Sequence, residues 1–470
     1  MQTPPQASTA PLIADVLSKF VAELTLDAIP APVQDRAKQL ILDATGIAHA
    51  STHHDFARSA LAAVSTFGAG KSEVIGMSAR LALRDAVLMN GILVHGLDYD
   101  DTYLPGGLHV TASVFPCALA MAADLDLSGS DLLVAYIAGV EAAARLSAVA
   151  KGRLHLLGFH PTGLVAAFGC ALTAGKLLGL DTAQLTTAQG VTLSTASGSS
   201  RAYSQNAAWT KRMHPGWAGV AGITAAAFAR AGFIGARAVY EGRYGFFSMH
   251  LGDAVTPGDY RLATADLGRK WEIEQVAVKP FPIGQLSVAC LDCAIVLAQK
   301  HAIRSRDVRS IHALVPQEAI PIVCEPLEQR RRPATGYAAQ FSLQYAIACG
   351  LVRGRFGLAE LDDAALSDPE ILAVVDKVSY AIDPKSEYPK HYSGELTVVT
   401  HDGREFTHRE HVNRGAAERP LSGAEIAAKF MANTERAVPR ARAEKILALL
   451  LKLEQAPSAK TVARELAAAE

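Results

Sequence analysis

A helical pattern of apolar residues runs from about residue 10 to about residue 250, and it constrains the fold more than any other feature of this chain. Within it, residues 164–178 and 218–231 are rich in Ala and Gly. Small side chains allow neighbouring helices to approach each other closely. We therefore expect a compact all-helical domain whose central helices are buried.

The pattern changes near Asp259. After it, strands are predicted at residues 273–278, 308–315, 377–382 and 395–400, and helices at 286–300, 339–351 and 368–375. A hairpin turn is predicted at 401–403, where Gly403 is free to adopt a positive φ. After residue 412 the sequence becomes helical again, and residues 443–453 form an amphipathic pattern.

These elements predict a mainly α fold with two domains. A large all-helical domain is formed by both chain ends, residues 1–258 and 413–470, and a smaller α+β lid domain, residues 259–412, is inserted between them. Clefts between domains are favoured ligand sites, so we expect the functional site there.

Composition excludes several classes of function. The formal net charge of −1 provides no basic field for nucleic acid or for an acidic membrane surface. Residues 1–8 are polar and lack the basic start and apolar stretch of a signal peptide, and we find no uninterrupted apolar run of membrane-spanning length. The six cysteines lie mostly in apolar surroundings, which suggests a reducing cytoplasm. Cys290 and Cys293 have metal-ligand spacing, but no second pair accompanies them, so we expect no zinc or iron–sulfur site.

The most chemically dense segment is His95-Gly-Leu-Asp98-Tyr-Asp100-Asp101-Thr102, at the end of an apolar helix. On a helix, His95, Asp98 and Thr102 would share one face. Two neighbouring carboxylates raise each other's proton affinity, which suits one of them for acid or base chemistry. The alternative is a solvated helix end. We favour that alternative for Asp100 and a functional role for Asp98.

Three histidines stand where helices rich in small residues are predicted to begin: His109, His160 and His214. Pro161 and Pro215 follow two of them at the favoured first helical position. Helix N-termini attract carboxylates and disfavour the imidazolium form, so a neutral histidine there can act as a base near pH 7. The alternative is that each histidine only caps its helix.

Basic residues next to proline-bounded turns are candidates for binding substrate carboxylates. Lys211 and Arg212 directly precede Met213-His214, and Lys279 begins the segment Lys-Pro-Phe-Pro. The alternative for each is an ordinary surface charge. The basic run at residues 330–332 is interpreted as a solvated loop.

Taken together and in this order, these residues resemble the MmgE/PrpD family, which includes 2-methylcitrate dehydratases, cis-aconitate decarboxylases and iminodisuccinate epimerases. The resemblance covers nearly the whole chain. It rests on residues 90–102, Gly-Phe-His-Pro-Thr at 158–162, Lys-Arg-Met-His-Pro-Gly-Trp at 211–217, Lys-Pro-Phe-Pro at 279–282 and Gln-Phe-Ser-Leu-Gln-Tyr-Ala at 340–346.

The resemblance implies a homodimer that acts on a small carboxylate, without a cofactor or metal, by proton transfer next to a carboxylate. It implies a site made of Asp98, Thr102, His109, His160, Lys211 and Lys279, with His214 adjacent. We take His109, Asp98, Thr102, His160 and Lys211 as the catalytic candidates, and Lys279, His214, Arg212 and Gln285 as the substrate-binding candidates. The leading function is a hydro-lyase similar to 2-methylcitrate dehydratase. An epimerase of a dicarboxylate or a cis-aconitate decarboxylase-like enzyme is the alternative.

One segment departs from the family pattern. After Lys-Pro-Phe-Pro, family members commonly carry basic residues, whereas this chain has Gln285 and Val288. A catalytically inactive homologue that binds a carboxylate therefore stays an alternative. So does a class II terpene cyclase, which uses an Asp-x-Asp-Asp motif like residues 98–101, although aromatic residues make up only 6% of the chain.

Overall fold

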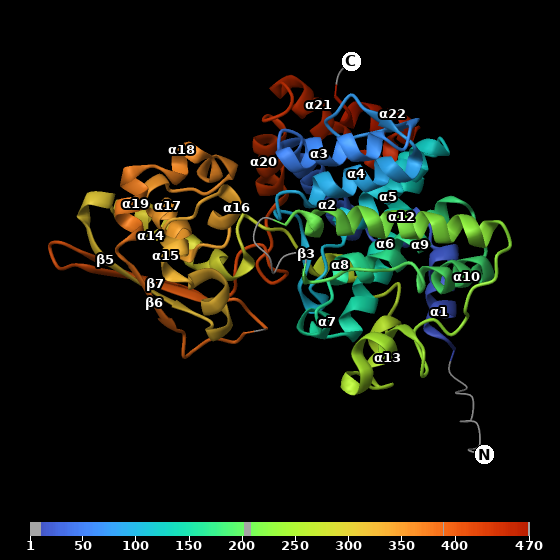
Figure 1. The fold of residues 1–470 in the computed structure, drawn as a ribbon, viewed down its shortest axis with the longest axis horizontal. Coiled ribbons are helices and arrows are strands. Elements are labelled where there is room, and N and C mark those ends of the chain that lie inside the picture. The colour runs from blue at the N-terminus through green and yellow to red at the C-terminus, as the bar shows by residue number, and fades with distance from the viewer. Residues whose placement is uncertain (1–10, 202–207, 389, 469–470) are drawn as a thin grey trace. The chain divides into compact units, whose positions relative to one another are not determined.

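The structure is a computed structural model that describes residues 11–201, 208–388 and 390–468 of the chain (Figure 1). The predicted polar N-terminal tail therefore lies outside the described residues. The chain divides into two compact units. The first comprises Met1–Gly96, Asp100–Val276 and Gly423–Glu470, and the second comprises Leu97–Tyr99 and Ala277–Ser422. Both boundaries of the inserted unit lie further along the chain than the predicted residues 259 and 412, and the three-residue segment 97–99 was not foreseen as part of it.

The first unit is built almost entirely of helices. Its strands β1 (Ala69–Glu73) and β2 (Arg80–Leu81) form a small antiparallel pair, and Thr102–Tyr103 is the short strand β3. Its helices are α1 (Ile13–Glu23), α2 (Ala31–Ser51), α3 (Asp55–Ser65), α4 (Leu83–His95), α5 (Thr111–Asp124), α6 (Gly129–Val149), α7 (Arg153–Leu156), α8 (Pro161–Leu164), α9 (Ala166–Leu177), α10 (Thr182–Thr192), α12 (Thr210–Arg230), α13 (Phe246–Leu251), α20 (Gly423–Thr434), α21 (Arg440–Leu450) and α22 (Ala459–Leu466).

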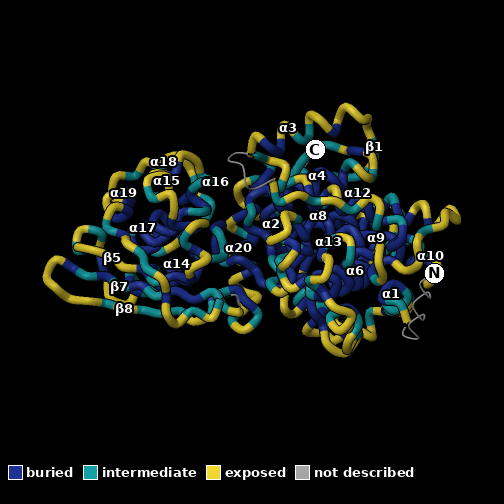
Figure 2. The backbone as a smooth tube through the Cα atoms, turned by 60° about the horizontal axis from the view of Figure 1, so that its bottom comes forward, coloured by how far each residue is buried: buried dark blue, intermediate teal, exposed yellow. Residues whose placement is uncertain are grey.

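Small residues form the closest helix contacts of this unit, as the sequence predicts. A Cβ atom on Gly222 of α12 would lie 2.5 Å from the backbone nitrogen of Ala171 in α9. A Cβ atom on Gly91 of α4 would lie 2.4 Å from Cα of Gly216 in α12. Only glycine allows backbones to approach this closely. Helix α12 therefore packs against both α4 and α9, in a part of the unit that is largely buried (Figure 2).

Helix α6 is long and apolar enough to cross a membrane by length and composition, although no such run was expected. Most of it is buried inside the first unit, with 94% of its 18-residue apolar window covered. Glu141 and Arg145 form an ion pair in its interior at 3.2 Å, and the Arg145 guanidinium also donates to the Ala265 and Lys270 carbonyls. These contacts make α6 the core helix of this unit.

The second unit combines a four-stranded sheet with helices. The sheet has the order β6-β5-β7-β8, in which β6 is parallel to β5 and the other pairs are antiparallel. Burial alternates along β7, so one face of the sheet is covered, and the core joins that face to helices α14 and α17. The elements are β4 (Val276–Ala277, at the unit boundary), α14 (Val288–His301), β5 (Val308–Val315), α15 (Leu327–Arg331), α16 (Gly336–Ala339), α17 (Leu343–Arg353), α18 (Asp363–Leu366), α19 (Pro369–Val375), β6 (Val378–Ile382), β7 (Gly394–Thr400) and β8 (Glu405–Glu410).

Most predicted elements after residue 280 are confirmed, including the turn at Gly403, whose φ is 85°. The strand predicted at 273–278 is wrong, because only Val276–Ala277 is extended and Glu272–Gln275 form a 3₁₀ turn. The backbone N–H of Ile273 donates to the buried Glu141 carboxylate at 2.8 Å, which holds this turn.

The pair Cys290 and Cys293 lies in the core of the second unit. Both thiols donate to backbone carbonyls, of Leu314 and Gly394. Burial raises the pKa of the Cys290 thiol to about 12 and that of the Cys293 thiol further still. Both side chains are therefore protonated core residues near neutral pH.

Candidate functional site

The acidic segment does not continue helix α4. The helix ends at His95, Gly96 follows as its C-cap, and Asp98 adopts a left-handed φ of 50°. Thr102 lies in strand β3. The predicted common helical face of His95, Asp98 and Thr102 is therefore wrong, because the backbone turns before Asp98. Short polar residues such as Asp tolerate this left-handed conformation better than most.

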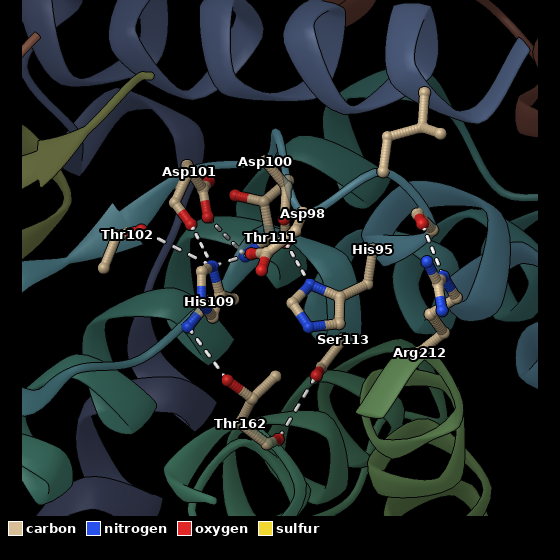
Figure 3. Close-up of polar contacts among 12 residues, drawn as sticks. His95, Asp98, Asp100, Asp101, Thr102, His109, Thr111, Ser113, Thr162 and Arg212 are labelled. Carbon is tan, nitrogen blue, oxygen red and sulfur yellow. Dashed lines mark hydrogen bonds and ion pairs between the residues drawn. The ribbon is translucent and has the colours of Figure 1, made fainter. Parts of the chain in front are cut away.

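The turn brings Asp100 back to His95. The Nδ1–H of His95 donates to Asp100 Oδ2 at 2.8 Å, and both residues are only 1% exposed (Figure 3). The expectation that Asp100 sits in a solvated helix end is thus wrong. A buried carboxylate needs a donor or a cation, and His95 supplies the donor.

Asp101 points into the same buried region. It is 2% exposed, and its Oδ1 accepts a 3.4 Å hydrogen bond from the backbone N–H of Thr111, at the start of α5. Burial raises the pKa of Asp101 to about 7, with the neighbouring Asp100 carboxylate adding to the shift and the Thr111 hydrogen bonds opposing it. Burial therefore favours the protonated form of Asp101 at pH values where an ordinary aspartate is ionised.

His109 is held on two sides. Its ring Nδ1–H donates to the backbone carbonyl of Asp101 at 2.7 Å, with the Thr102 hydroxyl 3.4 Å away, and its backbone N–H donates to Thr162 Oγ1 at 3.1 Å (Figure 3). Because Nδ1 carries the proton toward Asp101, Nε2 is the ring atom left to accept or release a proton. The His109 side chain is 12% exposed. Helix α5 begins two residues later, as predicted.

His160 and His214 form a pair. Their Nδ1 atoms are 2.8 Å apart, so one ring donates and the other accepts. His160 is the N-cap of α8 and Pro161 is its first residue, which confirms that prediction. The prediction for His214 is wrong, because α12 begins at Thr210 and Pro215 lies inside it.

The rings of His95, His109 and His160 gather in one place, which we call the histidine cluster. Ring centroids lie 4.7 Å apart for His95 and His109, 5.8 Å for His95 and His160, and 6.2 Å for His109 and His160. Burial, followed by the Lys211 charge, lowers the pKa of His160 well below its ordinary value. Burial also lowers the pKa of His214 to about 4. Both rings of the His160–His214 pair are neutral at pH 7.

Lys211 and Arg212 lie in the first turn of α12. The Lys211 charge adds to burial in lowering the pKa of His160, His155 and His214, and Lys211 lies three residues before His214 on α12. Arg212, labelled in Figure 3, donates through Nε to the Gly96 carbonyl at 2.7 Å. Its guanidinium lies 4.7 Å from the centre of the Phe56 ring. These contacts hold the end of α4, and substrate binding by Arg212 stays a prediction.

Asp98 and Lys279 belong to the second unit. The Lys279 ammonium donates to the backbone carbonyl of Asp98 at 2.6 Å and to its Oδ1 at 3.1 Å. Gln340 donates to the carbonyls of Leu97 and Pro282 at 2.7 and 3.0 Å. Residues 97–99 are therefore anchored by the Lys-Pro-Phe-Pro segment and by Gln340.

Gln285 and Val288 have different environments in the second unit. Both amide atoms of Gln285, Oε1 and Nε2, are buried and have no hydrogen-bond partner among the described residues. A buried unpartnered amide suits a ligand that supplies the missing partners. Val288 is fully buried in the apolar core.

The structure thus brings Thr102, His109, His160, His214 and Lys211 together in the first unit, and pairs Asp98 with Lys279 in the second. Five participants were not among the sequence-based candidates: His95, Asp100, Asp101, Thr111 and Thr162. Thr162 lies within the motif at 158–162, and the spacing from His95 to Asp100 was visible in the sequence. The contact itself depends on the turn at Asp98, which the helical interpretation did not include.

Comparison with known proteins identifies relatives of this chain. The family model of the MmgE/PrpD N-terminal domain matches residues 15–257, and that of the MmgE/PrpD C-terminal domain matches residues 281–455. The chain is 28% identical to cis-aconitate decarboxylase from Homo sapiens over 441 residues, which cover 90% of this chain and 88% of that protein. It is 26% identical to cis-aconitate decarboxylase from Mus musculus, covering 89% and 86%. It is 25% identical to that from Aspergillus terreus, covering 94% and 93%.

Proposed function

Because the chain belongs to the MmgE/PrpD family, we propose that it is a lyase that transfers a proton next to a carboxylate group of a small tricarboxylate. Decarboxylation of a cis-aconitate-like acid is the first candidate reaction. It is supported by relatives named cis-aconitate decarboxylase that align with nearly the whole chain. The observation that carries the proposal is His109, whose Nδ1–H is bound to the Asp101 carbonyl and whose Nε2 is thereby the proton-exchanging atom.

The proposed reaction requires one proton and one carbon–carbon bond cleavage. The bond to the departing carboxylate breaks, its electron pair enters the remaining carbon framework, and carbon takes up a proton as CO₂ leaves. His109 delivers this proton from Nε2. The Thr162 hydroxyl fixes the backbone at His109, and the Asp101 carbonyl fixes the ring tautomer.

Binding of the polyanion is assigned to groups that carry positive charge or attract negative charge. Lys211 supplies an ammonium group next to the histidines, and its charge acts on His160 and His214. Helix α5 begins two residues after His109, and the start of a helix favours a nearby anion. We assign Lys279 to holding Asp98, which it contacts through two hydrogen bonds, and Asp98 to shaping the segment that leads into Asp100.

Dehydration of a hydroxy-tricarboxylate is the second candidate, and Gln285 favours it. Its buried amide has both a donor and an acceptor without partners among the described residues. A hydroxyl group can satisfy both, whereas a carboxylate can satisfy only the donor. Epimerisation of a dicarboxylate uses the same proton transfer and remains a further alternative. A homodimer and a cytoplasmic location are proposed with this function.

The experiment supplies the purified chain with cis-aconitate, with 2-methylcitrate and with iminodisuccinate. Release of CO₂ identifies decarboxylation, a rise in ultraviolet absorbance from a new C=C bond without CO₂ identifies dehydration, and solvent deuterium exchange without either identifies epimerisation. The His109→Ala variant should lose about 10²- to 10⁴-fold in kcat. The matched control is His401→Ala, which removes an exposed histidine of the second unit and should keep full activity.

Full activity of a folded His109→Ala variant would refute the assignment of the proton donor. A panel of these acids that raises the melting temperature while none is converted would show instead an inactive carboxylate-binding homologue.

A further inference from the structure

The histidine cluster has the composition of a metal site. Each of His95, His109 and His160 can offer one ring nitrogen such that the three atoms lie within 4.8 Å of one another. Three neutral imidazoles form the protein ligand set of one class of zinc enzyme. Imidazole nitrogen selects zinc, copper and nickel over magnesium and calcium.

His95 provides a second, independent observation. Its ring is fully buried, its Nδ1–H is used by Asp100, and its Nε2 has no hydrogen-bond partner among the described residues. An unpaired buried nitrogen costs free energy unless something binds it. A metal ion at this position would supply the missing partner.

In each ring of the histidine cluster, the Nδ1 atom, which would not bind the ion, has a hydrogen-bond partner, as is usual for metal-binding histidines. In metal sites, the nitrogen that does not bind the ion usually donates to a carboxylate or to a backbone carbonyl, which fixes the tautomer. Here His95 donates to the Asp100 carboxylate and His109 donates to the Asp101 carbonyl. The Nδ1 atom of His160 contacts that of His214. The contacts of His95 and His109 leave Nε2 of both rings to bind a metal ion, and His160 offers its Nε2 in the tautomer whose Nδ1–H donates to His214.

We propose that the histidine cluster binds one divalent transition-metal ion, such as Zn²⁺, through the Nε2 atoms of His95, His109 and His160, and that the bound ion inhibits the enzyme. Zinc–nitrogen bonds of about 2.0–2.1 Å require the nitrogens of a tetrahedral site to lie roughly 3.4 Å apart. The nitrogens, now within 4.8 Å of one another, must therefore move closer by up to roughly 1.4 Å. His109 is the partly exposed member, so its side is the route of entry.

The inhibition has a direct chemical reason that rests on the proposed function. Nε2 of His109 cannot exchange a proton with substrate while its lone pair binds a metal ion. The ion also adds positive charge next to Lys211, and the Asp100 carboxylate, 2.8 Å from His95 and 3.6 Å from His109, balances part of it. Metal binding itself does not depend on the proposed reaction.

Binding is tested on the metal-stripped full chain by titration with Zn²⁺ against a chromophoric chelator. We expect one ion per chain for the unmutated protein and no stoichiometric binding of Mg²⁺. His95→Ala removes one ligand and should weaken Zn²⁺ binding by at least about 100-fold. Asp100→Asn keeps all three histidines and removes only the carboxylate that holds the His95 ring, so it should weaken binding by about 10- to 100-fold. The exposed-histidine control His401→Ala should bind Zn²⁺ as tightly as the unmutated protein.

Unchanged Zn²⁺ affinity in folded His95→Ala, or no stoichiometric site in the unmutated chain, overturns the proposal. Co²⁺ added to the unmutated chain provides a test that needs no variant. Intense visible bands of a low-coordinate nitrogen site support the site, and the weak bands of an octahedral ion overturn it.

Activity separates this proposal from the proposed function. Loss of turnover on binding one Zn²⁺, restored by chelator, supports both. Stoichiometric binding with unchanged turnover overturns the inhibition and the role of His109, while the metal site stands. Absence of any turnover overturns the proposed function, and the binding titration still decides the metal site.

Discussion

Asp101→Asn is expected to change how the stability of the first unit depends on pH. The folded-state pKa of Asp101 is about 7 against an ordinary value of 3.8, chiefly because of burial. A carboxyl group whose pKa is raised on folding destabilises the protein as pH rises, beginning near the unfolded value and ending above the folded value. At about 1.4 kcal/mol per pKa unit, the loss is about 4 kcal/mol between pH 4 and pH 8. More than half of it falls between pH 5 and pH 8.

Asparagine has nearly the same shape and no proton to lose in this range. Its side-chain oxygen can still accept from the Thr111 N–H, so the variant should keep the fold and lose this part of the pH dependence. The difference between variant and unmutated protein isolates Asp101 from other buried carboxyls such as Glu141, whose pKa burial also raises to about 7. At pH 8 the variant should be the more stable of the two.

The assay is urea unfolding at pH 5 and pH 8, followed by tryptophan fluorescence. All three tryptophans, Trp209, Trp217 and Trp271, lie in the first unit, so their signal reports on that unit. The control is Asp253→Asn, an exposed residue of the same unit. A variant whose free energy of unfolding changes with pH as steeply as that of the unmutated protein would refute the burial of an ionisable Asp101.

Two further predictions concern packing and buried charge. Gly222→Ala places a methyl group within 2.6 Å of the α9 backbone and should lower the free energy of unfolding by about 1–3 kcal/mol in the same urea assay. The control is Gly258→Ala, whose added methyl group would lie 3.6 Å from its nearest neighbouring atom and should change the stability little. Equal effects of the two variants would contradict the close contact. Arg409→Met leaves the fully buried Asp383 side chain without its 2.7 Å ion pair and should destabilise the second unit by about 3–5 kcal/mol, measured as faster hydrogen exchange in β5 and β7. Unchanged exchange would show that Asp383 does not need this partner.

Elements with a strong local pattern could be predicted from the sequence. Strand β5 was predicted at its observed bounds, because its apolar residues face a core on one side of the sheet. The strand at 273–278 failed because its conformation depends on Glu141, which lies more than 130 residues away in the sequence and binds the Ile273 N–H. A pattern of neighbouring residues cannot predict a hydrogen bond between residues so far apart in the sequence.

The candidate site was predictable in its composition and not in its geometry. His109 and His160 were found because each precedes a helix whose start is visible in the sequence. His214 was misplaced because Pro215 usually marks a helix start, whereas here it lies inside α12. His95 was singled out but given the wrong partners, because its contact with Asp100 depends on the left-handed turn at Asp98, and a helical pattern gives no sign of such a turn.

The proton on Asp101 also bears on how this site can accept a polyanion. Asp100 and Asp101 are adjacent and both buried, and two ionised carboxylates there would repel a tricarboxylate. The His95 N–H donates to the Asp100 carboxylate, while burial and the neighbouring Asp100 favour the protonated form of Asp101. Near neutral pH the site can therefore carry one fewer negative charge than its sequence indicates. Lys211 then faces neutral histidines, and its positive charge is available to the substrate that we propose.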